Sequence, residues 1–131
     1  EMMAKYEGKV VYLDIWSLGC GPCRVSMPYS KKLKAKLSDA PVEFVYLTVD
    51  SYSDNLWNNV FDVSLTHENH YRLKKGFNSR LHEFMEINWV PCYMIFDKKG
   101  RLVDYNADRP SRLVGKEKTK LEKDLRKIAL R

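Results

Sequence analysis

The sequence predicts an α/β fold with a central mixed sheet of about four to five strands flanked by helices. Apolar runs rich in β-branched and aromatic residues at 10–16, 42–49 and 93–96 lack the alternation of a half-exposed strand, which is typical of buried strands. Segments with helical spacing lie between and after them. The resulting order is strand, helix, strand, helices, hairpin, helix.

A crossover helix is expected at 24–39, between the first two strands. Parallel strands need a connection of about this length, and an apolar residue recurs here every four positions. The positions are Val25, Tyr29, Leu33 and Leu37. Pro28 falls inside this segment and is expected to kink it, because proline lacks an amide donor and crowds the preceding turn.

The middle third of the chain is predicted to hold helices at 53–61 and 77–87, with a long loop at 63–76 between them. After the strand at 93–96, a shorter strand is expected at 102–105. The intervening Asp97-Lys98-Lys99-Gly100 has glycine where a positive φ is expected, so the two strands should form an antiparallel hairpin.

The C-terminal segment 116–131 is predicted to form a helix that docks on the core. Its apolar residues have helical spacing and its lysines lie between them on the solvated side. The apolar residues are Leu121, Leu125, Ile128 and Ala129. Just before this segment, Asp108 or Ser111 is expected to cap the start of a helix.

The length of 131 residues allows one substantial core, so residues 1–131 are predicted to form a single domain. The formal net charge is +6, but the 23 Lys and Arg are scattered among 17 Asp and Glu, which favours a solvated basic surface over a nucleic-acid site. No run approaches the ~20 apolar residues of a membrane span, and there is no signal peptide pattern. Because the chain begins abruptly just before a strand, we expect a domain excised from a longer protein, with any membrane tether outside it. The chain is expected to be a monomer.

Cys20-Gly21-Pro22-Cys23 follows the first predicted strand and opens a helical segment. Two cysteines at this spacing can close a small disulfide ring. At a helix N-terminus, the amides and the helix dipole stabilise the thiolate of the first cysteine, which is the attacking species in thiol–disulfide exchange. Three cysteines are too few for a disulfide framework, so the pattern indicates one reactive pair and one accessory thiol, Cys92.

A structural disulfide or half of a zinc site is the alternative for this pair. A zinc site usually needs four ligands. Further ligands would have to come from Cys92, His67, His70 or His82, which form no second close pair. The metal interpretation is therefore weak, and no metal is expected.

These motifs together resemble the thioredoxin-like superfamily. The resemblance rests on the following elements in order: Asp14-Ile15-Trp16, Cys20-Gly21-Pro22-Cys23-Arg24, Pro28, Val90-Pro91 and Lys99-Gly100. It spans nearly the whole chain. Residues Met27-Pro28 and the segment 106–111 are similar to TlpA/ResA-type bacterial thiol–disulfide oxidoreductases. The resemblance implies a thioredoxin fold that ends in a β-hairpin plus helix, in an exported or membrane-tethered protein.

Cys20 is the candidate nucleophile, because it is the first cysteine and lies at the predicted helix start. Cys23, one turn further in, would then attack Cys20 and release reduced substrate. By resemblance, Asp14 is a buried acid with a raised pKa that relays protons to or from Cys23. The alternative is an aspartate that points outward or caps a neighbouring amide.

The remaining expected site residues surround the cysteine pair. The resemblance implies a cis Val90–Pro91 bond beside Cys20, where the Val90 backbone pairs with an extended substrate segment. Trp16 is expected to pack beneath the active-site loop, although an ordinary core tryptophan is almost as good an account. Trp16, Gly21, Pro22, Val90 and Pro91 are thus the candidate substrate-binding residues.

Three positions depart from the family pattern. Gly19 stands where many relatives have tryptophan, which removes a surface aromatic and leaves substrate preference open. Tyr46 stands where thioredoxin has a lysine near the buried acid, so the proton relay is expected to differ. Cys92 follows Pro91, where threonine is common, and is either a buried small hydrophobe or a thiol that perturbs the active pair.

The predicted function is therefore exchange of disulfides with protein substrates through Cys20 and Cys23, without a bound organic cofactor, supplied with electrons by an upstream donor protein. Reductase or isomerase activity is favoured over oxidase activity. The resemblance implies a periplasmic or otherwise extracytoplasmic location in a bacterium. The alternative is a non-catalytic binding module with a structural disulfide or metal at the cysteine pair. A peroxidase is disfavoured, because neither cysteine lies in a Pro-x-x-x-Thr-x-x-Cys setting.

Overall fold

A single mixed sheet organises the described part of the chain. The computed structural model describes residues 3–17, 19–48, 69–72 and 90–131. In these ranges the strand order is β3-β2-β1-β4-β5. The strands are β1 (Val10–Trp16), β2 (Val42–Thr48), β3 (His70–Arg72), β4 (Cys92–Phe96) and β5 (Leu102–Asp104). β1, β2 and β3 are parallel to one another, whereas β4 is antiparallel to both β1 and β5.

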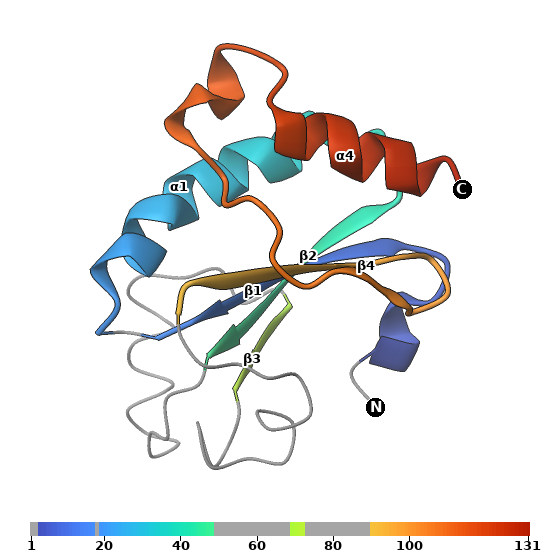
Figure 1. Ribbon diagram of the computed structural model, residues 1–131, viewed down its shortest axis with the longest axis horizontal. Helices are drawn as coiled ribbons and strands as arrows, with labels where there is room; N and C mark the ends of the chain where they lie inside the picture. Colours follow the sequence, from blue (N-terminus) through green and yellow to red (C-terminus); the bar gives the residue numbers. More distant parts are fainter. Residues whose placement is uncertain (1–2, 18, 49–68, 73–89) are drawn as a thin grey trace.

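Within these ranges, two helices cover one face of the sheet (Figure 1). α1 (Gly21–Lys36) connects the parallel strands β1 and β2, and α4 (Lys120–Ala129) lies beside it near the C-terminus. Two short 3-10 helices, η1 (Met3–Tyr6) and η3 (Arg112–Gly115), precede β1 and α4. The predicted α/β class with a mixed sheet is confirmed.

The central strand β1 is buried along its whole length, as its continuous apolar run predicted. Alternate residues point to opposite faces. Tyr12 and Trp16 lie in the cluster under the helices with Leu33 and Leu125. Leu13 and its odd-numbered neighbours lie in a second cluster on the other face, with Tyr6, Val45 and Met94. Asp14 therefore points to the helix-covered face.

The hairpin between β4 and β5 is confirmed. Gly100 has a φ of +78°, the left-handed conformation that glycine adopts without a Cβ clash. The Asp97 carboxylate accepts hydrogen bonds from the Lys99 and Arg101 amides, each at 2.9 Å. These features agree with the turn expected from the sequence. β4 begins at Cys92, one residue earlier than predicted.

The crossover helix is confirmed and starts at the cysteine motif as expected, but its buried face differs in part from the prediction. α1 begins at Gly21, because Cys20 serves as its N-cap and proline is favourable in the first turn. Val25, which was placed on the buried face, is 66% exposed. The buried side carries Cys23, Ser26, Ser30 and Leu33.

The predicted long loop at 63–76 is partly wrong, because it contains β3. Asn69, just before this strand, has a φ of +60°. Its side-chain amide donates to the Glu43 carboxylate and to the Phe44 carbonyl, and its own carbonyl accepts from the Tyr46 amide. Side-chain and backbone bonds to β2 thereby fix a strand that its polar sequence did not indicate. The predicted helices at 53–61 and 77–87, and the rest of the loop, lie outside the described residues.

The C-terminal helix is confirmed in its central part. All four apolar residues predicted to face the core are buried: Leu121, Leu125, Ile128 and Ala129. Ser111 caps η3, as one of the two expected caps, by accepting from the Leu113 amide at 3.2 Å. In the ranges that the structure describes, no helix is long and apolar enough to cross a membrane.

Candidate active site

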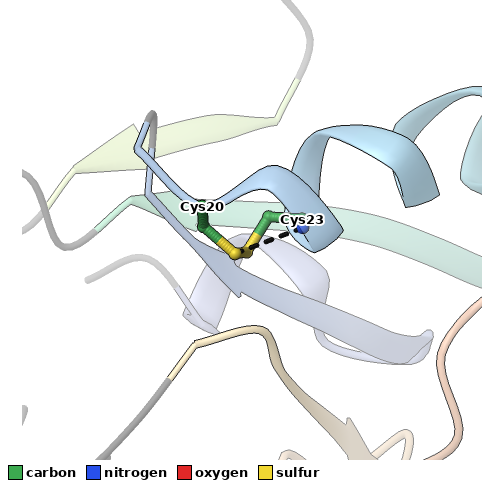
Figure 2. The surroundings of a disulfide bond; sticks show 2 residues. All are labelled: Cys20 and Cys23. Carbon is green, nitrogen blue, oxygen red and sulfur yellow. Dashed lines mark hydrogen bonds between the residues drawn. A yellow bond between two sulfur atoms is a disulfide. The ribbon is translucent and has the colours of Figure 1, made fainter.

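A disulfide joins Cys20 and Cys23 at the beginning of α1 (Figure 2). Cys20 has extended backbone angles just before the helix, and Cys23 lies in its first turn, with 5.3 Å between their Cα atoms. The Cys23 amide donates a hydrogen bond to the Cys20 sulfur at 3.2 Å. The sulfur that caps the helix is therefore the one that the helix N-terminus stabilises as a thiolate after reduction.

The two cysteines differ in exposure. Cys20 is partly exposed and Cys23 is fully buried, whereas Gly21 and Pro22 between them are both exposed. An incoming disulfide therefore reaches Cys20 first. This difference fits the predicted order of attack, with Cys20 as the outer and Cys23 as the inner thiol.

Val90 and Pro91 are placed beside this pair by the sheet register. Ile15 near the end of β1 pairs with Cys92 at the start of antiparallel β4, so the residues before Cys92 run next to the loop that leads to Cys20. The Val90–Pro91 bond is cis, as expected. Both residues are partly exposed, and Val90 and Cys20 pack against the same buried cluster.

Trp16 lies beneath the loop. Its side chain is 1% exposed and belongs to the same buried cluster as Cys23. The ring therefore supports the cysteine pair from below and presents no surface to solvent.

Asp14 is buried on the helix-covered face, so the outward-pointing alternative is wrong. It is 1% exposed, and neither carboxylate oxygen accepts a hydrogen bond from any described residue. Burial raises the pKa of Asp14 to about 8, because the charged form loses its hydration. An acid that titrates near neutral pH is suited to exchange protons with a thiol.

Three tyrosines surround Asp14 on this face. Tyr46 on β2 and Tyr93 on β4 are its neighbours in register, and Tyr12 precedes it on β1. Burial raises the pKa of Tyr46 to about 12, Ser30 opposes this rise, and the charge of Asp14 adds to it. Burial and Asp14 also raise the pKa values of Tyr12 and Tyr93. All three phenols therefore stay protonated at neutral pH.

Cys92 lies on the opposite face from Asp14 and Cys23. It packs against the second cluster, which includes Ile15 and Leu47, and it forms no disulfide. Burial, with a smaller contribution from Asp14, raises the pKa of its thiol. These features favour the buried-hydrophobe interpretation over a thiol that perturbs the pair.

The metal alternative has no support in the described ranges. No group of three or more His, Cys, Asp or Glu side chains there could hold a metal ion. His70 stacks on Tyr46, with 4.5 Å between ring centroids. His67 and His82, the other candidate ligands, lie outside the described residues.

Ser30 was missed by the sequence reasoning. It is fully buried and shares a 2.6 Å hydrogen bond with the Tyr46 hydroxyl. The available signal was spacing, because Ser26 and Ser30 follow Cys23 at intervals of three and four residues on one face of α1. This spacing was overlooked because the apolar residues predicted to form the buried face of the helix, such as Val25 and Tyr29, lie one position away from the two serines.

A disulfide at a helix N-terminus, beside a cis-proline and above a buried acid on a mixed sheet, defines a thioredoxin-like protein with a redox site. The family model for thioredoxin-like proteins matches residues 8–102, and the chain belongs to this family. The predicted thioredoxin fold is thereby confirmed.

The sequence is similar to those of a thiol-disulfide oxidoreductase and a thioredoxin. Thiol-disulfide oxidoreductase ResA of Bacillus cereus is 28% identical over 123 residues, which cover 93% of this chain and 65% of that protein. The chain thus spans slightly less than two thirds of this relative. Thioredoxin of Coprinus comatus is 38% identical over 47 residues, or 36% of this chain and 44% of that protein.

Solved structures agree with these relatives. A protein from Bacteroides vulgatus assigned as a thiol-disulfide oxidoreductase has a TM-score of 0.74 at 26% identity, covering 94% of this chain and 82% of that chain. The thioredoxin domain of a thiol-disulfide oxidoreductase from the same organism has a TM-score of 0.76 at 20% identity, covering 97% and 84%. The second comparison shows the shared fold. ResA and both Bacteroides vulgatus proteins are named as thiol-disulfide oxidoreductases.

Proposed function

We propose that this chain is a thiol–disulfide oxidoreductase that acts on protein substrates through Cys20 and Cys23, as a reductase or isomerase rather than an oxidase. The observation that carries the proposal is the disulfide at the start of α1, with Cys20 accessible and Cys23 buried. The names of the relatives support the same activity. The activity belongs to a single domain, 1–131, that works in an extracytoplasmic compartment.

The reductase reaction has two exchange steps. The Cys20 thiolate attacks a substrate disulfide, so a mixed disulfide forms and one substrate thiolate leaves. The Cys23 thiolate then attacks the Cys20 sulfur, which closes the Cys20–Cys23 disulfide and releases the second substrate thiolate. The substrate gains two electrons and the cysteine pair loses two. A dithiol donor protein restores the pair by the reverse exchange.

Asp14 handles the proton of the second step. Its carboxylate accepts the Cys23 proton as the thiolate forms, and its raised pKa makes it a base matched to a thiol. Exposed Gly21 and Pro22, together with Val90 and Pro91, form the surface on which an extended substrate segment lies next to Cys20. Trp16 supports this surface from below.

Reduction of insulin in the presence of dithiothreitol tests the proposal. We expect catalysis by the native chain, and none above the dithiothreitol background with Cys20→Ser, because the attacking thiolate is gone. Cys23→Ser should accumulate a mixed disulfide with the substrate, which is visible by mass spectrometry. Absence of catalysis by the native chain, with or without bound zinc, would instead favour the binding module.

Cys92→Ala is the matched control, because Cys92 is a cysteine on the other face of the sheet. We expect unchanged insulin reduction and a single Cys20–Cys23 disulfide after air oxidation. A disulfide that includes Cys92 in the native monomer would contradict its assignment as an inert thiol. The reduction potential of the pair against glutathione separates a reductant from an oxidant, because potentials in this class span about −270 to about −120 mV.

A further inference from the structure

A row of side chains crosses the sheet beneath α1. In register, Tyr93 on β4, Asp14 on β1, Tyr46 on β2 and His70 on β3 occupy neighbouring positions on four strands. Residues in register on one face are close enough to interact directly. Whether Asp14 receives a donor from its own row therefore depends on where the hydroxyls of the two tyrosines are held.

Tyr46 is held away from Asp14 from two sides. Its hydroxyl shares a buried 2.6 Å hydrogen bond with the Ser30 hydroxyl on α1. Its ring stacks on His70, with 4.5 Å between centroids and 12° between planes. Neither oxygen of Asp14 accepts a hydrogen bond within the described ranges, although Tyr46 is its nearest neighbour on β2.

Ser30 is the controlling partner in this arrangement. It lies on the same buried side of α1 as Cys23, two helical turns further along. A serine side chain is seldom buried completely, and a buried hydroxyl needs a hydrogen-bond partner. Here the partner of the Ser30 hydroxyl is Tyr46, the neighbour of Asp14 on β2. Without it, the Tyr46 hydroxyl would be a buried donor in need of an acceptor, and the ionised Asp14 carboxylate is the strongest acceptor on this face.

We propose that Ser30 is a positioning residue of the site: by holding the Tyr46 hydroxyl it withholds a hydrogen-bond donor from the Asp14 carboxyl. A donor would stabilise the ionised carboxylate and make it a weaker base toward Cys23. Ser30 thereby keeps the Asp14 carboxylate a stronger base toward the Cys23 thiol. The catalytic meaning of this role rests on the proposed function, whereas its effect on Asp14 does not.

Other titratable groups also face Asp14. Tyr12 on β1 donates its hydroxyl to the Asp108 carbonyl at 2.6 Å. The Tyr93 hydroxyl makes no hydrogen bond of acceptable geometry among the described residues, although Ser26 lies near enough to lower its pKa. From α1 the face is covered by Cys23, and His70 lies beyond the Tyr46 ring. Of the two tyrosines in the row, Tyr46 is therefore the one whose hydroxyl a serine on α1 holds by a hydrogen bond.

Titration of the Asp14 side-chain carboxyl by carbon-13 NMR tests this role in the oxidised full chain. We expect Ser30→Ala to move the midpoint to lower pH by about one pH unit, because the released Tyr46 hydroxyl donates to the carboxylate. The double variant Ser30→Ala/Tyr46→Phe should return to the native midpoint, since it has no hydroxyl to release. Tyr46→Phe alone should also keep the native midpoint.

Two controls separate positioning from structural support. Ser30→Thr retains the hydroxyl and should keep the native midpoint. Ser26→Ala removes a serine from the same side of α1 and should leave the midpoint unchanged, because the Tyr93 hydroxyl is not hydrogen-bonded in the native chain. Sucrose in every sample favours the folded state of the less stable variants.

The proposal is overturned if Ser30→Ala titrates like the native chain, or if the double variant keeps the shift of Ser30→Ala. The pH profile of insulin reduction is the second readout and should move in the same direction as the NMR midpoint. If the native chain reduces no disulfide, the proposed function fails while the NMR titration still decides the role of Ser30.

Discussion

At the scale of single residues, Gly19 shapes the surface next to the exposed cysteine. It is exposed, and a Cβ placed there meets no atom within 4 Å. Its φ lies outside the left-handed region, so a larger residue is not strained there. The position can therefore carry a side chain that touches substrate without disturbing the fold.

Gly19→Trp is expected to lower the KM for insulin about fivefold, because the indole adds apolar contact area beside Cys20. The Cys20–Cys23 reduction potential and the melting temperature should stay the same. Steady-state kinetics measures the KM, equilibration with glutathione measures the reduction potential, and thermal unfolding measures the melting temperature. Gly19→Ala is the control and should leave the KM unchanged; an equal effect of Ala and Trp would show that backbone freedom, and not the ring, governs binding.

Much of the site could be predicted from the sequence, because the types and the spacing of its residues indicate their chemistry. The cysteine pair and an acid in the middle of an apolar strand are visible in the sequence once the strands are placed. The cis bond before Pro91 was expected only from the resemblance to the thioredoxin-like superfamily, because most X-Pro bonds are trans. Ser30 is different, because a serine on a helix is ordinarily a solvated residue. Only its three-dimensional pairing with Tyr46, 16 positions away, reveals its role.

At the scale of elements, a buried carboxylate joins α4 to α1. Glu122 on α4 is 1% exposed and forms ion pairs with Lys36 at 2.9 Å and with Arg126 at 3.0 Å. Arg126 also donates to the Lys36 carbonyl at the end of α1 and pairs with Asp39. Burial opposes ionisation, but the hydrogen bonds from Lys36 and Arg126 outweigh it and lower the pKa of Glu122.

Glu122→Gln should destabilise the chain by about 2 kcal/mol, because both cations lose their shared anion at the helix contact. Urea unfolding at neutral pH measures this cost. In the native chain, the stabilisation by the Glu122 ion pairs should vanish as the pH falls through the lowered pKa of Glu122, since only the ionised carboxylate forms these pairs. Asp124→Asn removes an exposed pair with Lys120 on the same helix and should have no measurable effect. A cost equal to that of Glu122→Gln would show that the buried ion pairs of Glu122 do not stabilise the contact between α4 and α1.

The periodicity of apolar residues along the sequence predicted the helices and strands whose formation depends on their own residues. The start of α1 at the cysteine motif was predicted, although its N-cap, Cys20, is not among the usual capping residues. β3 was missed because its three residues carry little β-strand signal. Its place is fixed by partners distant in the sequence: Asn69 bonds to Phe44, and the Tyr6 hydroxyl to Asn69 and Tyr71.

At the scale of the whole molecule, Asp14 couples stability to pH. An unfolded aspartate titrates near pH 4, and the folded one at about 8. Between these values the folded chain holds a proton that the unfolded chain has lost. Stability therefore falls as the pH rises through this window and levels off above it.

Asp14→Asn should remove this decline, because the amide does not titrate. Urea unfolding of both proteins from pH 4 to pH 9 should show the native chain losing on the order of 5 kcal/mol relative to the variant. Insulin reduction by the variant should also lose the pH dependence near neutrality. Parallel stability curves for the two proteins would show that Asp14 does not titrate in this range.

The overall topology was predictable because each strand that borders the site is a continuous apolar run, and right-handed crossovers leave few alternatives. The sheet edge was less predictable. An edge strand such as β3 is buried on fewer sides, so composition constrains it weakly, and contacts from the N-terminal segment decide its position.

Trp16 lies beneath the cysteine pair, so its fluorescence reports on the redox state of the site. The indole is shielded from water and lies in one buried cluster with Cys23, and a disulfide is an efficient quencher of tryptophan emission. Reduction of the Cys20–Cys23 disulfide therefore increases the fluorescence of Trp16. Each turnover can be followed in real time by fluorescence, without attaching a dye.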